Sequence, residues 1–320
     1  MSGWEHMPAV EDPARTSNHP PDVSVVVVHY ETPDLLEACL RALGASQGPV
    51  SMELTIVDNA SSQFPESAVM SAHPSGRVIK NTHNAGFAVA ANQGLRAARG
   101  RYLLLLNPDA FVEPDTLAQM VGYMDERPDV GCATARVLLE DGRLDLACRR
   151  SFPTPRRALF RVALLSRLFP NSRLFAQYNL TYLDEGVETE IDSPCGAFMM
   201  VRAEVAREVG LLDERYFMYG EDIDWAYRIK SAGWRVMYAP VTTVRHVKRA
   251  SSRLEPERTI RAFHDAMRIF YRKHYRDIYP RWLSWLVFRA IDARQALQLT
   301  AIRLRGRGRR GPPRTEAARP

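Results

Sequence analysis

Acidic side chains follow two apolar runs of the sequence, at points where a ligand could reach them. Asp109 comes after the aliphatic run 102–106 and an Asn107-Pro108 step, and Asp58 closes the shorter run 53–57. In α/β folds, ligands bind just beyond the carboxyl ends of buried strands, so a carboxylate there can hold a metal ion or a ligand hydroxyl. Asp58 is also able to accept the N3–H of a uracil or thymine ring. The alternative for both residues is an ordinary turn that Asx hydrogen bonds close.

The densest acidic feature is the segment Gly220-Glu221-Asp222-Ile223-Asp224-Trp225. A carboxylate directly after a glycine is open to close approach, and it can take a proton from an attacking hydroxyl. Trp225, one turn further on, offers a ring that could stack on a sugar or belong to the core. Acidic residues in the first turn of a helix are also favoured by the helix dipole, which is a purely structural explanation.

His246 is the candidate partner for the carboxylate at position 109. A hard divalent cation prefers oxygen ligands and a diphosphate to share, and one carboxylate cannot complete such a site. His246 ends a predicted strand and is followed by Lys248 and Arg249. A lone histidine in this position is more often structural or solvated, so both interpretations stay open here.

The elements that must position these residues alternate between strands and helices. Predicted strands cover 23–29, 53–57, 77–80 and 102–106, and helices are expected from Pro33, across the Ala-rich segment after residue 84, and over 114–124. This alternation predicts a parallel, doubly wound sheet with helices on both faces. Further along, Asp141-Gly142 favours a hairpin. Residues 193–210 indicate a strand leading into a helix that stops at Gly210, residues 220–234 a helix with an acidic first turn, and residues 236–238 a strand. Residues 150–185 are rich in arginine and aromatic residues and show no clear period.

Several classes of protein lack support in the sequence. No GxGxxG follows the first predicted strand, which argues against a dinucleotide-binding dehydrogenase, and no GxxxxGK[ST] indicates a P-loop ATPase. The four cysteines are scattered without metal-binding spacing, as in a reduced cytosolic protein. No apolar run reaches the roughly 20 residues that a membrane span requires.

Charge divides the chain into an acidic body and a basic end. Residues 1–244 carry a net charge of −8 and residues 245–320 a net charge of +14. A basic end of this kind favours contact with a polyanionic surface, either anionic lipid or nucleic acid, although a merely solubilising tail is the simpler alternative. Arginines flank aromatic residues between 263 and 291, as at a lipid interface, but a helical extension packed on the body explains them equally well.

The motifs together resemble those of a known family. Residues 23–250 resemble the family 2 glycosyltransferases of the GT-A fold, and most closely the bacterial rhamnosyltransferase-like branch. The resemblance is carried by "VSVVVVHYETPDLLEACLRAL", "LTIVDNASS", "NTHNAGFAVAANQGLRAARGRYLLLLNPDA" and "SPCGAFMMVRAEVAREVGLLDERYFMYGEDIDWAYRIKSAGWRVMYAPVTTVRH". It implies a Rossmann-like, mostly parallel doubly wound α/β sheet with a C-terminal helical extension.

The resemblance also implies roles for individual residues. It assigns a nucleotide site to Tyr30, Thr32, Asp58, Asn84 and Asn107. Asp109 corresponds to the metal-binding Asp of the motif usually written DXD, which here is Asn107-Pro108-Asp109 and lacks its first carboxylate. His246 matches the position that completes a site for Mg²⁺ or Mn²⁺. Asp222 corresponds to the catalytic base. From their own place in the acidic segment, apart from the resemblance, we expect Glu221 and Trp225 to contact the sugar or the acceptor.

The function that this resemblance implies is an inverting, metal-dependent sugar transfer. The expected donor is dTDP-L-rhamnose, followed by UDP-sugars, and the expected acceptor is a saccharide, free or linked to polyprenyl diphosphate, in bacterial cell-surface polysaccharide synthesis. We expect a cytoplasmic protein that binds an anionic membrane surface through its C-terminal region, and no nucleic acid partner. The rivals are a non-catalytic carbohydrate-binding scaffold and an arginine-rich nucleic-acid binder, which the net acidic body disfavours.

We expect four segments along the chain. Residues 1–21 form a disordered leader, 22–250 the GT-A domain, 251–300 an amphipathic helical extension, and 301–320 a disordered Arg-rich tail.

Overall fold

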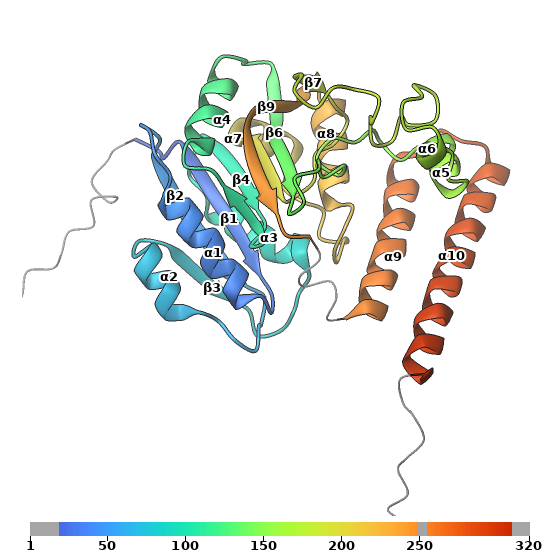
Figure 1. The fold of residues 1–320 in the computed structure, drawn as a ribbon, viewed down its shortest axis with the longest axis horizontal. Helices are drawn as coiled ribbons and strands as arrows, with labels where there is room; N and C mark the ends of the chain where they lie inside the picture. The colour runs from blue at the N-terminus through green and yellow to red at the C-terminus, as the bar shows by residue number, and fades with distance from the viewer. Residues whose placement is uncertain (1–18, 249–254, 309–320) are drawn as a thin grey trace, which may run out of the picture.

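A computed structural model describes residues 19–248 and 255–308 of the chain. One nine-stranded sheet runs through the body, with strand order β3-β2-β1-β4-β8-β6-β9-β5 and β7 paired to β9 (Figure 1). The leader expected over 1–21 and the tail expected over 301–320 fall largely on residues 1–18 and 309–320, which lie outside the described residues.

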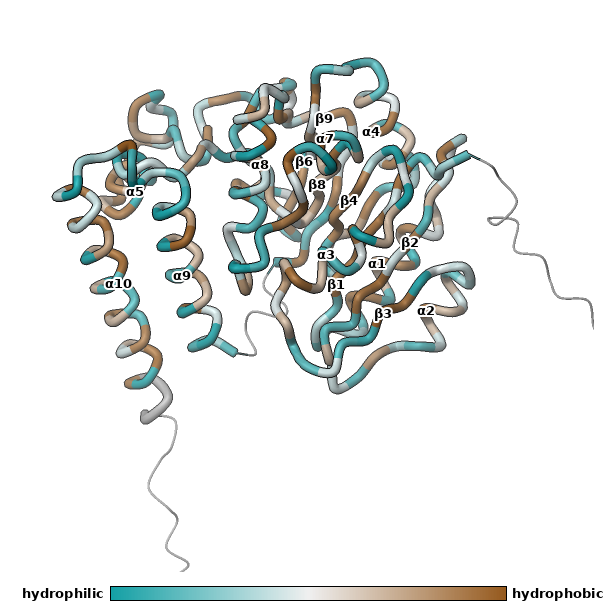
Figure 2. Tube along the Cα trace, turned by 180° about the vertical axis from the view of Figure 1, so that it is seen from behind, coloured by the Kyte–Doolittle hydropathy of each residue, from teal (hydrophilic) through white to brown (hydrophobic). Residues whose placement is uncertain are grey.

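The first half of the sheet is parallel, as the alternating pattern predicts. Its strands are β1 (Val23–His29), β2 (Met52–Asp58), β3 (Arg77–Lys80) and β4 (Tyr102–Leu106). Their crossover helices are α1 (Pro33–Gly44), α2 (Glu66–Ala72) and α3 (Phe87–Ala97). The chain moves in one direction across the sheet from β1 to β3 and then returns to the other side of β1 to form β4. Because crossover connections are right-handed, helices of connections that run in opposite directions lie on opposite faces. Helices α1 and α2 accordingly cover one face and α3 the other (Figures 1 and 2).

The second half of the sheet is mixed. Its strands are β5 (Ala110–Val112), β6 (Val130–Leu139), β7 (Thr189–Glu190), β8 (Phe198–Arg202) and β9 (Arg235–His246). β8 lies antiparallel between β4 and β6, whereas β6 and β9 are parallel. The helices here are α4 (Thr116–Asp125), α7 (Ala203–Val209) and α8 (Glu221–Ser231). The hairpin expected at Asp141-Gly142 is present, since Leu139 N donates to Arg143 O and Gly142 has φ +78°.

The register of the strands sets the position of the candidate residues. His29 lies opposite Asp58 across β1 and β2, and Val27 lies opposite Leu106 across β1 and β4. Ala110 lies opposite His246 across β5 and β9. Because parallel strands end at the same edge, the segments after β1, β2 and β4 meet there, and the pairing of β5 with β9 brings His246 to Asp109.

Helices α5 (Pro155–Val162), α6 (Leu165–Leu168), α9 (Pro256–His274) and α10 (Arg281–Gly308) form a separate group at one side of the sheet (Figure 1). A second aromatic core, which includes Phe270, Tyr271 and Tyr275, joins α9 to the body. α10 continues to Gly308, past residue 300 where we expected the helical extension to end. None of the described helices combines the length and apolarity needed to cross a bilayer.

Candidate active site

Asp58 is held in place at the carboxyl end of β2. Its Oδ1 lies 3.2 Å from His29 Nδ1, and the backbone N–H of Ser61 donates to the same oxygen at 3.2 Å. Thr32 N donates to His29 Nε2 at 3.2 Å, so His29 is neutral with its proton on Nδ1, facing Asp58. Burial lowers the pKa of His29 despite the bond to Asp58, which agrees with this tautomer. The arrangement orients one oxygen of Asp58.

A chain of amide side chains extends from Asp58 toward the loop before α3. Asn59 Nδ2 donates to Asn84 Oδ1 at 3.0 Å, and Asn59 Oδ1 accepts from Asn81 Nδ2 and from Ala85 N. Gly86 follows with φ +90°, and a Cβ there would stand 2.6 Å from Phe217 O, so only glycine fits this close approach. Asn84 therefore occupies a fixed position near Asp58.

Tyr30 and Thr32 line the turn between β1 and α1. Tyr30 Oη donates to Glu255 Oε1 at 2.7 Å, and this contact raises the pKa of Tyr30. It ties the turn to the start of α9. Thr32 precedes α1, and its buried Oγ1 has no hydrogen-bond partner among the described residues, which leaves an acceptor and donor available at this edge.

Asp109 and His246 are in contact, although 137 positions separate them in the sequence. His246 Nε2 lies 3.3 Å from Asp109 Oδ1, and His246 Nδ1 lies 3.0 Å from Asp145 Oδ2. Lys248 Nζ donates to the other oxygen of Asp145 at 2.6 Å. Burial alone would lower the pKa of His246, but the hydrogen bonds to Asp109 and Asp145 outweigh it and raise this pKa to about 9.

A divalent cation at this group would displace the proton that His246 Nε2 shares with Asp109, because only a neutral imidazole binds a metal. A carboxylate oxygen and an imidazole nitrogen stand side by side, and the second imidazole nitrogen is held by a carboxylate, as metal-ligating histidines usually are. Among the described residues, no group of three or more His, Cys, Asp or Glu side chains could hold a metal ion unaided. Diphosphate oxygens and water would therefore have to supply the remaining ligands.

Asp222 lies in the first turn of α8 and is held by three N–H groups. Arg150 Nη2 donates to its Oδ2 at 2.7 Å, and Gly196 N donates to the same oxygen at 3.2 Å. Ile223 N donates to Oδ1 at 2.8 Å. Gly220, directly before α8, adopts φ +81°, which lets the chain turn sharply into the helix.

The short segment 194–197 joins Asp222 to the end of β4. Arg150 Nη2 also donates to Pro194 O, Gly196 N binds Asp222, and Ala197 O accepts from Asn107 N at 3.1 Å. Burial first, and then the charges of Asp145 and Asp222, raise the pKa of Cys195 in this segment to about 12, although Arg150 opposes the shift. Segment 194–197 therefore connects Asp222 to the loop that carries Asp109.

Glu221 stands beside Asp222 but is buried. Burial first, and then the neighbouring charge of Asp222, raise the pKa of Glu221 to about 8. Its Oε2 has no hydrogen-bond partner among the described residues. A protonated carboxyl with a free oxygen can donate to or accept from a ligand hydroxyl.

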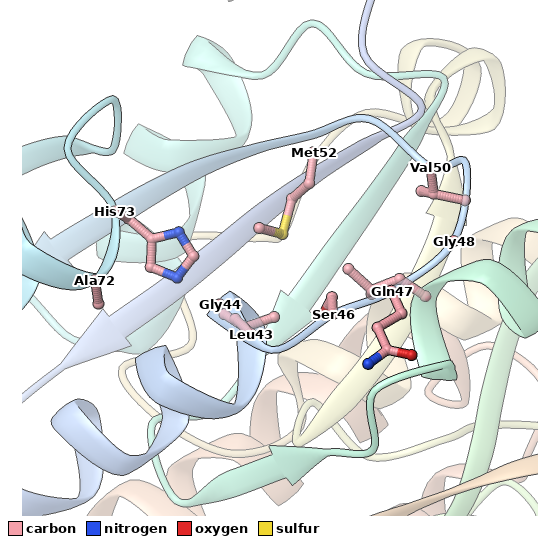
Figure 3. Close-up of a pocket in the computed structure, with 10 residues that line it drawn as sticks. Leu43, Gly44, Ser46, Gln47, Gly48, Val50, Met52, Ala72 and His73 are labelled. Carbon is pink, nitrogen blue, oxygen red and sulfur yellow. The ribbon is translucent and has the colours of Figure 1, made fainter.

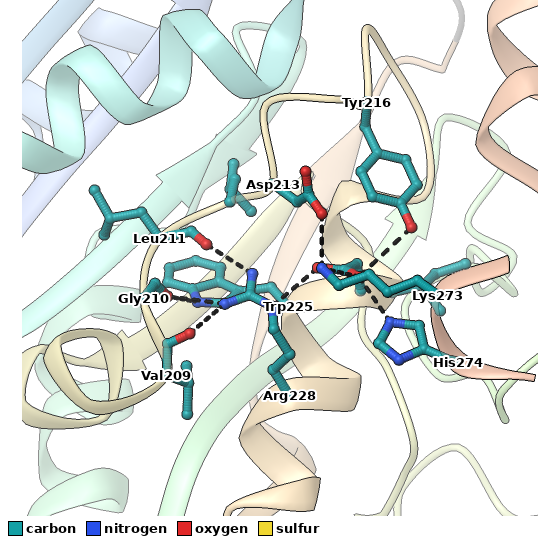
Figure 4. A network of polar contacts seen from close by, with 12 residues as sticks. Val209, Gly210, Leu211, Asp213, Tyr216, Trp225, Arg228, Lys273 and His274 are labelled. Atoms are coloured by element: carbon teal, nitrogen blue, oxygen red, sulfur yellow. Dashed lines mark hydrogen bonds and ion pairs between the residues drawn. The ribbon is translucent and has the colours of Figure 1, made fainter. Parts of the chain in front are cut away.

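Trp225 requires a correction. We expected its ring to contact the sugar or the acceptor, with a place in the core as the alternative. The structure supports the alternative, because the side chain is fully buried in the main core and its Nε1 donates to Gly210 O at 2.8 Å (Figure 4). A ring without exposed surface offers no stacking face, so Trp225 supports α8 from within.

Asp224 fastens α8 to α9. It has no exposed surface, and its carboxylate binds Lys273 Nζ at 2.9 Å, His274 Nε2 at 2.7 Å and Arg228 Nε at 2.9 Å. Figure 4 shows Lys273 and His274 reaching this point from α9, while Arg228 also binds the carbonyls of Val209, Gly210 and Leu211. The helix that carries Asp222 is therefore fixed to the C-terminal helices.

A small pocket lies elsewhere, at the opposite edge of the sheet. It measures about 310 Å³ and is lined by the end of α1, the start of β2 and the end of α2, including Leu43, Met52 and His73 (Figure 3). None of the candidate residues lines this pocket. It lies at the amino ends of the strands, whereas the candidate residues lie at their carboxyl ends.

Three residues of the site were not anticipated. Arg150 lies in the segment 150–185 that shows no period, Asp145 lies in the hairpin after β6, and Asn59 follows Asp58 directly. Nothing in the sequence marked Asp145 as a site residue, because an acidic residue close to a hairpin turn such as Asp141-Gly142 is ordinarily exposed to solvent. Only the fold reveals that it supports His246.

Comparison with known proteins places the chain among sugar-transferring enzymes. The family described as "Glycosyltransferase like family 2" matches residues 20–262. Over 299 residues the chain is 26% identical to the N-acetylglucosaminyl-diphospho-decaprenol L-rhamnosyltransferase of Mycobacterium tuberculosis strain H37Rv, covering 89% of this chain and 95% of the relative. It is also 26% identical over 225 residues to the rhamnosyltransferase WbbL of Escherichia coli K12, covering 68% and 80% of the two chains.

Solved structures give the same fold. The mannosyltransferase PcManGT from Pyrobaculum calidifontis, in complex with GDP-Man and Mn²⁺, superposes with a TM-score of 0.54 at 19% identity, over 92% of this chain and 77% of that one. GalNAc-T7 with UDP, GalNAc and Mn²⁺ superposes with a TM-score of 0.51 at 16% identity, over 72% of this chain and 44% of that one. This chain thus spans less than half of GalNAc-T7. At these identities the similarity establishes the GT-A fold.

Proposed function

Because this chain belongs to the glycosyltransferase-like family 2 and is a glycosyltransferase, we propose that it transfers L-rhamnose from dTDP-rhamnose to a saccharide acceptor. UDP-sugars are the alternative donors. The acceptor is a saccharide linked to polyprenyl diphosphate, and the product enters bacterial cell-surface polysaccharide. Both rhamnosyltransferase relatives support the choice of sugar, and the mycobacterial N-acetylglucosaminyl-diphospho-decaprenol L-rhamnosyltransferase supports the choice of acceptor.

The observation that carries the proposal is the contact of Asp109 with His246 at the edge where β1, β2 and β4 end. The donor lies along this edge. Asp58 accepts the N3–H of the pyrimidine, Tyr30 and Thr32 line the base, and Asn84 and Asn107 border the nucleotide. The free Oγ1 of Thr32 and the fixed oxygen of Asp58 support these roles.

Asp109 and His246 would hold a divalent cation, Mg²⁺ or Mn²⁺, together with diphosphate oxygens. When bound, such a cation neutralises the charge that grows on the departing diphosphate. Asp145 orients the imidazole by accepting from its second nitrogen. Stabilisation of this kind lowers the barrier because it is stronger in the transition state than in the ground state.

Asp222 acts as the general base in a single displacement that inverts the anomeric carbon. It accepts the proton of the acceptor hydroxyl as the hydroxyl oxygen attacks and the bond to the diphosphate breaks. Arg150 and Gly196 orient its Oδ2. Glu221 is buried beside Asp222, so its Oε2, unpartnered among the described residues, would meet the sugar or the acceptor only when ligand binding exposes it.

The C-terminal region brings the enzyme to the cytosolic face of an anionic membrane. Its net charge of +14 over residues 245–320 supports electrostatic attraction to anionic lipid. Deletion of residues 309–320 is expected to weaken binding to anionic vesicles in a salt-dependent way. Binding that does not change on deletion would remove the tail from this role.

Slow hydrolysis of the donor tests the proposal without knowledge of the acceptor. We expect purified protein to hydrolyse dTDP-rhamnose or a UDP-sugar in the presence of Mn²⁺ or Mg²⁺, and to lose this activity with a chelator. Equal hydrolysis with and without the cation would contradict metal dependence. Preference for another nucleotide sugar would overturn the choice of donor while leaving the reaction class intact.

A further inference from the structure

The segment with α5 and α6 exposes an unusual number of large apolar side chains. Over residues 155–174 they are Leu159, Val162, Leu164, Leu168, Phe169 and Leu174. Leu168 is 69% exposed and Leu159 is 62% exposed. Exposed apolar residues scattered singly are normal, but a concentration of them in one short segment marks a surface that contacts something apolar.

The same segment is strongly basic. Residues 155–183 contain five arginines and no aspartate or glutamate. Arg161, Arg167 and Arg173 are exposed and form no ion pair with any carboxylate of the described residues. Apolar and cationic side chains that alternate without acidic neighbours are suited to the boundary between lipid headgroups and acyl chains.

The start of α10 contributes to this surface. α5 lies beside α9 and the first half of α10 in both views (Figures 1 and 2), and Trp282 and Trp285 on α10 are 66% and 60% exposed. Burial, together with the charge of nearby Arg161, lowers the pKa of Arg294 on α10. Because residues 155–183 hold no aspartate or glutamate, their exposed arginines are available to an anion such as a headgroup phosphate.

We propose that residues 155–174 and the start of α10 form a docking surface for an anionic phospholipid membrane, into which Leu168 and Phe169 insert. A second copy of the chain fits this surface less well. A two-fold interface would bring the same arginine-rich patch against itself, where the unpaired cations repel each other. An anionic bilayer complements both the apolar and the cationic side chains, and exposed tryptophans favour its interface.

This inference deepens the membrane part of the proposed function, on which it rests, and it adds a second contact, inside the catalytic chain, to the one assigned to the C-terminal region. Vesicle binding is measured without donor or acceptor, so the outcome does not depend on the sugar assignment. Comparison with the 309–320 deletion separates the two membrane contacts.

The test is co-sedimentation of the full chain with vesicles of phosphatidylcholine alone or mixed with phosphatidylglycerol. We expect binding to the mixed vesicles, and about tenfold weaker binding for Leu168→Glu and for Phe169→Glu, because each loses the insertion of one large apolar side chain. Arg161→Gln is expected to reduce the preference for the anionic vesicles. Met70→Glu is the matched control, since Met70 is similarly exposed on α2 at the other side of the molecule.

Binding of Leu168→Glu and Phe169→Glu equal to that of the wild type and Met70→Glu would overturn the proposal. So would a wild-type dimer, detected by light scattering without lipid, that Leu168→Glu dissociates. If only the 309–320 deletion weakened binding, the tail would be the membrane contact, and the proposal that the α5–α6 surface binds the membrane would be wrong. Thermal unfolding of each variant confirms that these exposed substitutions leave the fold intact.

Discussion

Arg150 Nη2 donates to Asp222 Oδ2 at 2.7 Å, and the two side chains are only 12% and 11% exposed. A buried charge pair of this kind is costly to break, because removing one partner leaves the other charge uncompensated. The pair therefore fixes the orientation of the candidate base before any substrate arrives.

Replacing Arg150 by methionine is expected to lower the free energy of unfolding by about 3–5 kcal/mol, as measured by urea denaturation. The double variant Arg150→Met, Asp222→Asn should recover part of this loss, since the buried carboxylate is then neutral. A single variant as stable as the wild type would show that the pair does not hold Asp222.

Asp145 is expected to control metal affinity through His246. Asp145→Asn removes the carboxylate that orients the imidazole and should weaken Mn²⁺ binding about 10–100-fold, measured as the Mn²⁺ dependence of donor hydrolysis. Asp141→Asn, in the exposed turn of the same hairpin, is the control. Unchanged Mn²⁺ dependence in Asp145→Asn would mean that His246 does not bind the metal.

Glu221 should make stability depend on pH. Its pKa rises from 4.5 in the unfolded chain to about 8 in the folded protein. Between these values the folded state holds the extra proton, so the contribution of Glu221 is fully present below pH 4.5 and is lost as the pH rises through 8. Glu221→Gln should therefore exceed the wild type in melting temperature above pH 8 and lose this advantage toward pH 4.5.

The exposed Glu140 provides the comparison for this experiment. Glu140→Gln makes the same chemical change at an exposed position. If Glu221→Gln and Glu140→Gln gave the same profile of melting temperature against pH, the conclusion that folding raises the pKa of Glu221 would be wrong.

Asp224 is expected to hold the C-terminal helices to the body. Asp224→Asn leaves Lys273 and His274 without their buried carboxylate and should cost about 3–5 kcal/mol of unfolding free energy. Hydrogen exchange should show the largest loss of protection in α8 and α9. Loss confined to other elements would contradict this anchoring role.

The sequence predicted the parts of the fold that local patterns specify. The aliphatic runs at 23–29 and 102–106 became β1 and β4, and Gly210 ended α7 as expected. The strand predicted over 236–238 and the strand predicted to end at His246 are one strand, β9, which pairs with both β6 and β5 over Arg235–His246. Pairing between distant strands leaves no local signal.

The site was predictable only where a motif marked it. The family motifs named Asp109 and His246, and the structure brings these two together. They did not indicate Arg150 or Asp145, whose partners lie far away in the sequence. Trp225 was misassigned because an aromatic residue at helical spacing has the same appearance whether it faces the core or a ligand.

The most direct test of the account is the turnover of Asp222→Asn compared with the wild type. We predict that kcat falls roughly 10²–10⁴-fold while the calorimetric affinity for the nucleotide sugar stays nearly unchanged, because the base acts only in the transition state. Turnover close to that of the wild type, in a variant that binds the donor normally, would contradict the central claim.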